Sequence, residues 1–104
     1  MMTDASAVRD ALRIVIDPEL GDNVVDLGFI YDIAVAGSAV RITMTATTPG
    51  CPATGFLKEG VANAAASVPG VDAVEVVMTF DPPWTEARIA PAARTLLGLA
   101  APSP

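Results

Sequence analysis

The chain has 104 residues, of which 52% are hydrophobic and 17% charged, so it can form the core of one small domain. Its formal net charge of −6 repels phosphate backbones and anionic lipid heads, which argues against binding to nucleic acid or to a membrane surface. The chain has no histidine and one cysteine, which excludes within one chain an internal disulfide, histidine-dependent catalytic triads and a closed structural zinc site.

The cellular location and domain organisation follow from similar observations. The N-terminus lacks the basic and apolar regions of a secretory signal, and no apolar run approaches the roughly 18 residues of a membrane span. A lone thiol also fits a reducing compartment, so we expect a cytoplasmic protein. We expect one domain over residues 1–104, with a core at about 4–98 and a frayed tail at 99–104.

The first predicted elements are a helix and a strand. Hydrophobic spacing predicts a helix over residues 4–15, capped by Thr3 or Asp4 and ended by Asp17-Pro18. Its buried face is expected to contain Val8, Ala11, Leu12 and Val15. Alternation predicts a strand over residues 24–35. The residues expected on its inner face are Leu27, Phe29, Tyr31, Ile33 and Val35.

A hairpin and a second strand follow. Gly37-Ser38 suits a tight turn, and the next strand is predicted over residues 40–47. Its inward residues are Val40, Ile42, Met44 and Ala46, and its outward ones Arg41, Thr43, Thr45 and Thr47. Such alternation is typical of a sheet with one face in water.

The second half of the chain contains a helix, a strand and a proline-rich loop. Cys51 lies in a loop before a helix that is predicted from Pro52 to about Ser67. The buried stripe expected on this helix is Leu57, Val61, Ala64, Ala65 and Val68, and a third strand is predicted over residues 71–80. The loop Asp81–Trp84 cannot extend that strand, because its two prolines lack the N–H groups that a ladder needs. Thr85 would cap a short helical region that reaches about Leu97.

Together these elements predict a two-layer α+β fold of order α-β-β-α-β-α, with helices on one face of a three-stranded mixed sheet. The hairpin makes the first two strands antiparallel, and the helical crossover makes the third parallel to the second. The segments 17–26, 45–51 and 81–84 should therefore emerge at the same edge of the sheet.

That edge is the predicted site, and Cys51 would present a thiolate there, the form of the side chain that binds iron or attacks sulfur. A helix N-terminus favours the thiolate, whereas nearby carboxylates oppose it, and we expect the helix end to prevail. The supporting residues expected around the thiol are Asp17, Glu19, Asp26, Thr45, Thr48, Gly50, Asp81 and Trp84.

Each of these residues also has a structural interpretation. A lone cysteine is commonly a small buried hydrophobe. Asp17, Glu19 and Asp26 are also suited to capping turns, and Thr48 to a turn. Trp84 would then cover an edge of the core.

Several separated motifs resemble the SufT/PaaD-type family of iron–sulfur cluster assembly factors. The motifs are Asp17-Pro18-Glu19, Asn23 to Tyr31, Met44-Thr45, Thr48 to Pro52, and Asp81 to Trp84, and the resemblance covers residues 8 to about 98. The family also contains a cytosolic targeting factor of eukaryotes and the N-terminal domain of some Mrp-type carrier ATPases. PaaD-like members usually carry an added cysteine-rich C-terminal part, which this sequence lacks, and so the shorter SufT-like branch is favoured.

The resemblance implies a role in maturing iron–sulfur proteins, with Cys51 contacting iron or sulfide. One cysteine cannot supply the usual four cluster ligands, so a cluster would bridge two chains, bridge to a client, be held transiently or use small-molecule thiols. The expected partners are assembly proteins, apo-client proteins and a second copy in a homodimer.

Two other functions stay open. The first is a non-catalytic adaptor that binds assembly proteins and clients without holding a cluster. The second is a thiol enzyme such as a persulfide carrier, which is disfavoured because the chain has neither a resolving cysteine nor a histidine base. We expect an assembly factor rather than a catalyst.

Overall fold

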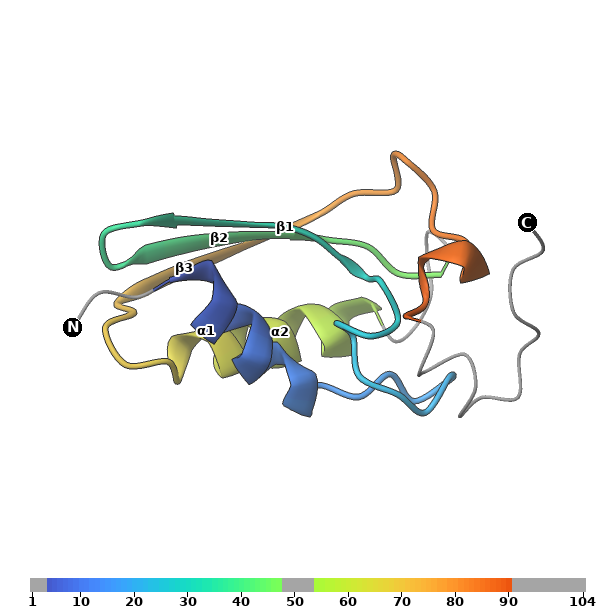
Figure 1. Ribbon diagram of the computed structural model, residues 1–104, viewed down its shortest axis with the longest axis horizontal. Coiled ribbons are helices and arrows are strands. Elements are labelled where there is room, and N and C mark those ends of the chain that lie inside the picture. Colours follow the sequence, from blue (N-terminus) through green and yellow to red (C-terminus); the bar gives the residue numbers. More distant parts are fainter. Residues whose placement is uncertain (1–3, 48–53, 91–104) are drawn as a thin grey trace.

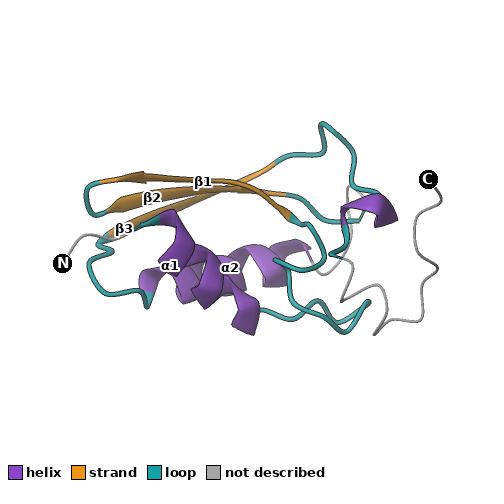
Figure 2. Cartoon of the chain, in the orientation of Figure 1, coloured by secondary structure: helices purple, strands orange, loops and turns teal. Residues whose placement is uncertain are grey.

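The computed structural model describes residues 4–47 and 54–90. Within these ranges the elements are, in chain order, α1 (Ala5–Ala11), the 3-10 turn η1 (Leu12–Ile14), β1 (Ile30–Ala36), β2 (Ala39–Met44), α2 (Thr54–Ala66), β3 (Ala73–Met78) and the 3-10 turn η2 (Glu86–Arg88). Helices α1 and α2 lie on the same face of the sheet (Figures 1 and 2). The predicted two-layer α+β fold is confirmed. Of the predicted C-terminal helical region, η2 lies within the described residues, and the part from residue 91 to about Leu97 lies outside them. No helix in the described ranges is long and apolar enough to cross a bilayer.

Helix α1 begins and ends through local hydrogen bonds. The Asp4 side chain accepts a hydrogen bond of 2.8 Å from the backbone N–H of Ala7, as an N-cap does. The α-helix ends at Ala11 and tightens into η1, so it is shorter than the predicted span to residue 15. Val8 and Leu12 are nevertheless buried on the predicted face.

The sheet has the predicted topology, with β2 in the centre. β1 pairs with β2 in antiparallel fashion, and Ala36 is opposite Ala39 across the two-residue turn at Gly37-Ser38. Gly37 has a φ of 62°, a conformation that two-residue hairpin turns require. β3 pairs with β2 in parallel, which confirms the crossover through α2.

The predicted strand over residues 24–35 was wrong in its first half. β1 begins only at Ile30, and residues 24–28 form turns. The side-chain oxygen of Asn23 accepts hydrogen bonds from the backbone N–H groups of Val25 and Asp26, at 3.1 and 2.9 Å, and so fixes the turn. Leu27 and Phe29 are fully buried, but they reach the core from this turn rather than from a strand.

A β-bulge changes the inner face of β1. Ile30 pairs with Met44 but Asp32 pairs with Thr43, so the extra residue is Tyr31. Ile30 and Ile33 are both buried, whereas Tyr31 is only half-buried. The expectation that Tyr31 shares the inner face with Ile33 was wrong, because the bulge breaks the two-residue alternation.

Helix α2 packs closely against the segment after α1. Its buried residues Leu57, Val61, Ala64 and Ala65 are those that the sequence predicted. Gly60 faces Val15, and a Cβ on Gly60 would lie 3.2 Å from Val15 Cγ1. This close approach brings the segment that contains Val15 onto the helix that follows the Cys51 loop.

Candidate functional site

Three segments far apart in sequence meet at the end of the sheet opposite the Gly37-Ser38 turn (Figure 1). The backbone N–H of Thr45 donates to the carbonyl of Phe29 at 2.8 Å, and that of Thr79 donates to Met44 at 2.9 Å. The N–H of Ala90 donates to the carbonyl of Asp26 at 2.6 Å. We call the segments 15–29, 45–47 and 79–90 at this edge the rim. Its formation confirms the topological argument for their convergence.

Trp84 ties the proline-rich loop to the turn before β1. Its indole N–H donates to the carbonyl of Leu27 at 2.7 Å, and its ring meets Phe29 edge-on, with centroids 5.3 Å apart. Phe29 is fully buried and Trp84 half-buried. Trp84 therefore covers an edge of the core and closes the rim, which is the structural role that the sequence also allowed.

The Asp26 carboxylate belongs to a local polar network. One oxygen accepts a 2.6 Å hydrogen bond from Arg13 Nη1, and the other accepts one of 3.0 Å from Asn23 Nδ2. The pair with Arg13 is partly exposed, so it contributes little to stability by itself. The network fastens the end of η1 to the first turn of the rim.

Asp17 is the most buried carboxylate candidate, at 2% exposure. It accepts a hydrogen bond of 2.9 Å from the backbone N–H of Leu20 and another from that of Glu19. Burial raises the pKa of Asp17 above its ordinary value of 3.8, the hydrogen bond from Leu20 opposes that increase, and the charge of Glu19 adds to it. The side chain thus organises its own turn while carrying a carboxylate with raised proton affinity.

The other described candidates lie at different depths of the rim. Thr45 is fully buried, so its expected outward orientation was wrong; β2 ends at Met44, and the alternation stops there. The Thr45 hydroxyl donates to the carbonyl of Ala46 at 3.3 Å.

Asp81 is exposed, and its backbone N–H and carbonyl both bond to the Thr79 hydroxyl at 3.2 Å. Glu19 is exposed at the far end of the Asp17 turn.

Cys51, Thr48 and Gly50 lie outside the described residues. The described chain resumes at Thr54, whose hydroxyl oxygen is buried and has no hydrogen-bond partner among the residues of 4–47 and 54–90. In the two described ranges, no three His, Cys, Asp or Glu side chains gather closely enough to hold a metal ion. The carboxylates of the rim therefore do not form a complete metal site by themselves.

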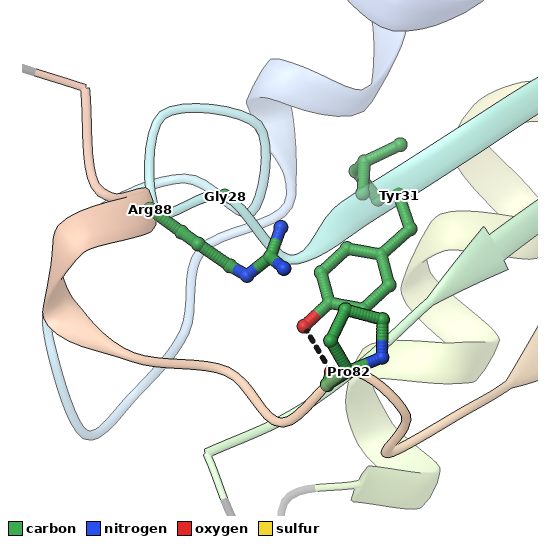
Figure 3. Close-up of a pocket in the computed structure, with 5 residues that line it drawn as sticks. Gly28, Tyr31, Pro82 and Arg88 are labelled. Atoms are coloured by element: carbon green, nitrogen blue, oxygen red, sulfur yellow. Dashed lines mark hydrogen bonds between the residues drawn. The ribbon is translucent and has the colours of Figure 1, made fainter.

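Sequence reasoning missed a pocket at the rim that contains Arg88. This open pocket of about 460 Å³ is lined by Gly28, Ile30, Tyr31, Pro82 and Arg88 (Figure 3). The guanidinium carbon of Arg88 lies 4.5 Å from the centroid of the Tyr31 ring, and the Tyr31 hydroxyl donates to the carbonyl of Pro82 at 2.8 Å. No sequence pattern near Arg88 indicated the pocket, because only the fold brings residues 28, 31, 82 and 88 together.

The fold and the rim define a small two-layer α+β domain in which loops from three segments meet beside the start of α2. The chain belongs to the iron–sulfur cluster assembly protein family, whose pattern matches residues 5–76. This match confirms the family resemblance, and it includes Cys51 and the first part of the rim.

Individual relatives agree with this assignment. A Porphyromonas gingivalis protein named Fe-S protein maturation auxiliary factor is 42% identical over 99 residues, which are 94% of this chain and 93% of that protein. The Staphylococcus aureus protein named Fe-S protein maturation auxiliary factor SufT is 36% identical over 87 residues, 83% of this chain and 99% of its own. The crystal structure of a domain of unknown function, DUF59, from Bacillus anthracis superposes with a TM-score of 0.85 at 37% identity, covering 91% of this chain and 92% of that one.

Proposed function

We propose that this chain assists the maturation of iron–sulfur proteins and that Cys51 contacts iron or sulfide during that process. The observation that carries the proposal is the family match over residues 5–76, which contains the one cysteine of the chain. The relatives named as maturation factors align over most of this chain and most of their own length, so the proposal does not depend on a shared fragment.

The chemistry of the side chains supports Cys51 as the contact residue. Thiolates are the usual protein ligands of iron–sulfur clusters, and the chain has one cysteine and no histidine. The remaining ligands would come from a second copy, a client protein or a small thiol. A cluster is then cargo that this chain holds transiently, and the chain is an assembly or carrier factor rather than a catalyst.

The surroundings of the cysteine loop give the rim residues their proposed supporting roles. The described chain stops at Thr47 on the rim and resumes at Thr54. Thr45 lies shortly before residues 48–53, and Thr54, whose hydroxyl has no hydrogen-bond partner among the described residues, directly follows them. We infer that Asp17, Glu19, Asp26, Asp81 and Trp84 shape this rim, and that Thr48 and Gly50 belong to the loop that presents Cys51.

The test is anaerobic reconstitution with iron and sulfide of the wild type beside Cys51→Ser. The wild type should bind iron and sulfide, absorb in the visible region and show the bound mass under native conditions. Cys51→Ser should lose all three signals while keeping its far-ultraviolet circular dichroism. Full retention of iron and sulfide in the variant would refute direct ligation by Cys51.

A non-catalytic adaptor is the second candidate, and exposed apolar side chains favour it. Ile14 is 74% exposed, Ile16 47% and Phe56 62%, and they lie on segments that touch through Val15 and Gly60. Such side chains often mark protein–protein contacts. An adaptor predicts that Cys51→Ser still captures the same assembly proteins and apo-clients and still supports client activity, whereas Phe56→Ser does neither.

A further inference from the structure

The pocket at the rim combines a cation, an aromatic ring and apolar walls. Arg88 is exposed, and among the described carboxylates none forms an ion pair with it, whereas Arg13 and Arg41 pair with Asp26 and Glu75. In Figure 3 the Arg88 side chain extends across the pocket towards the ring of Tyr31. In a chain of net charge −6, this guanidinium provides a local positive charge that can attract an anionic group.

The ring of Tyr31 fixes the position of that charge. A guanidinium over an aromatic ring is attracted to the ring face, and it keeps N–H groups free for an acceptor. The Tyr31 ring is itself held in place, because its hydroxyl donates to the Pro82 carbonyl at 2.8 Å. Less rotational freedom is then lost when a ligand binds to Arg88 than with a freely moving side chain.

The position of the Arg88 backbone is also determined. Gly28 has a φ of 76°, and a Cβ on it would lie 2.7 Å from Arg88 Cβ and even closer to the Arg88 carbonyl oxygen. The side chain of Arg88 therefore starts from a fixed point directly beside the turn that precedes β1. The pocket is built by contacts between segments and not by one mobile loop.

We propose that this pocket binds a carboxylate group, with the Arg88 guanidinium as its donor and with Tyr31 as the positioning residue. The hydroxyl hydrogen of Tyr31 is engaged by Pro82, so Arg88 supplies the polar contacts. The planar fork of a guanidinium matches two carboxylate oxygens. Gly28, Ile30 and Pro82 offer apolar contact, which suits a carboxylate on a short aliphatic stem.

A carboxylate fits this site better than a phosphate. A phosphate carries nearly two negative charges at neutral pH, and the exposed carboxylate of Asp81 lies next to Pro82 in the chain. The repulsion by a chain of net charge −6 is smaller for a single charge. The carboxylate has two natural sources, a small free acid and a glutamate side chain of a protein.

The two sources are separated by titrating the protein with butyrate and with the capped peptide Ac-Ala-Glu-Ala-amide, at constant ionic strength. Butyramide and Ac-Ala-Gln-Ala-amide are the matched uncharged controls, and inorganic phosphate is the competing anion. Binding is followed by the NMR shifts of Arg88 Nε–H and of the Trp84 indole N–H. These measurements require neither iron nor Cys51, so their outcome is independent of the proposed function.

We expect saturable binding of a carboxylate probe with a dissociation constant on the order of millimolar. Arg88→Gln should weaken it about 10-fold or more, and Tyr31→Leu several-fold, whereas Arg41→Gln should leave it unchanged. Tighter binding of butyrate supports a small free acid, and tighter binding of the peptide supports a protein ligand. Equal shifts with the amides, equal affinity in Arg88→Gln, or a preference for phosphate would overturn the proposal.

Discussion

The backbone of Arg88 lies directly against Gly28, so that a Cβ on Gly28 would come within 2.7 Å of Arg88 Cβ. This contact joins the turn before β1 to the loop after β3, two segments about sixty residues apart in sequence. Two independent reasons therefore favour glycine at position 28. A side chain would clash with Arg88, and the φ of 76° is unfavourable for residues other than glycine.

Gly28→Ala should lower the free energy of unfolding by at least about 2 kcal/mol, because it combines left-handed backbone strain with a clash against Arg88. Gly21→Ala is the matched control, since Gly21 has a φ of 75° but nothing within 4 Å of a Cβ. The control should lose only the strain, about 1 kcal/mol. Urea unfolding of both variants measures the difference, and equal losses would contradict the contact.

Trp84→Phe should lower the free energy of unfolding by about 1–2 kcal/mol. The substitution keeps an aromatic edge for Phe29 but removes the 2.7 Å hydrogen bond to the Leu27 carbonyl. Tyr31→Phe removes the more exposed bond to the Pro82 carbonyl and should lose less than about 1 kcal/mol. Thermal unfolding by circular dichroism compares the two variants, and a larger loss for Tyr31→Phe would be inconsistent with this account.

Asn23→Ala should destabilise the fold by about 1–2 kcal/mol, because the Asn23 oxygen accepts from two backbone N–H groups of the turn. Asn23→Ser keeps a side-chain acceptor for these N–H groups without placing a negative charge beside Asp26, and it should lose less. Asp26→Ala removes a partly exposed ion pair and should lose under about 1 kcal/mol. Urea unfolding measures these losses. A larger loss for Asp26→Ala than for Asn23→Ala would show that the turn depends on the ion pair instead.

Asp17 should make stability depend on acid pH in a specific direction. Burial raises its pKa in the folded state, so the folded chain binds the proton more tightly than the unfolded chain. Ionisation of Asp17 destabilises the folded chain, and this loss develops as the pH rises from 3.8, the ordinary pKa of the group, through its raised pKa in the folded state. The loss disappears at lower pH, where Asp17 is protonated in both states. Relative to Asp17→Asn, the wild type should therefore gain stability as the pH falls from 7 towards 4. Urea unfolding at several pH values measures this, and the opposite slope would show that hydrogen bonding outweighs burial.

Thr45→Val separates stability from the proposed function. Within the described part of the chain, the hydroxyl of this fully buried residue makes one hydrogen bond, of 3.3 Å, so its removal should change the free energy of unfolding by less than about 1 kcal/mol. If Thr45 supports the cysteine loop, the variant should bind less iron and sulfide after anaerobic reconstitution. A stable variant with wild-type iron and sulfide would remove Thr45 from the site.

Local sequence patterns predicted the elements that bury one regular face. The stripe of Val8 in α1 and Leu12 in η1 and the Leu57 to Ala65 stripe of α2 follow the helical period, and β2 alternates as expected up to Met44. The hairpin turn was predictable because two-residue turns require particular residues. The parallel pairing of β3 followed from the length of the crossover, and the meeting of three segments at the rim followed from that pairing.

The prediction failed where contacts between distant segments replace local periodicity. Residues 24–28 have the alternation of a strand, but Asn23 and Gly28 turn the chain there and Leu27 and Phe29 still reach the core. The bulge at Tyr31 shifts the inner face by one residue, and it also leaves Tyr31 at the rim, where Arg88 lies over it.

The sequence by itself determined the class of fold, the family and the identity of the one thiol, because these depend on periodicity, on motif order and on which residue types are present. Only the tertiary structure decided that Thr45 is buried, that Trp84 fastens the turn at Leu27, and that Tyr31 and Arg88 form a pocket. The physical reason is that such contacts join residues up to about sixty positions apart, and their geometry depends on a bulge and on a close backbone approach that leave no periodic trace in the sequence.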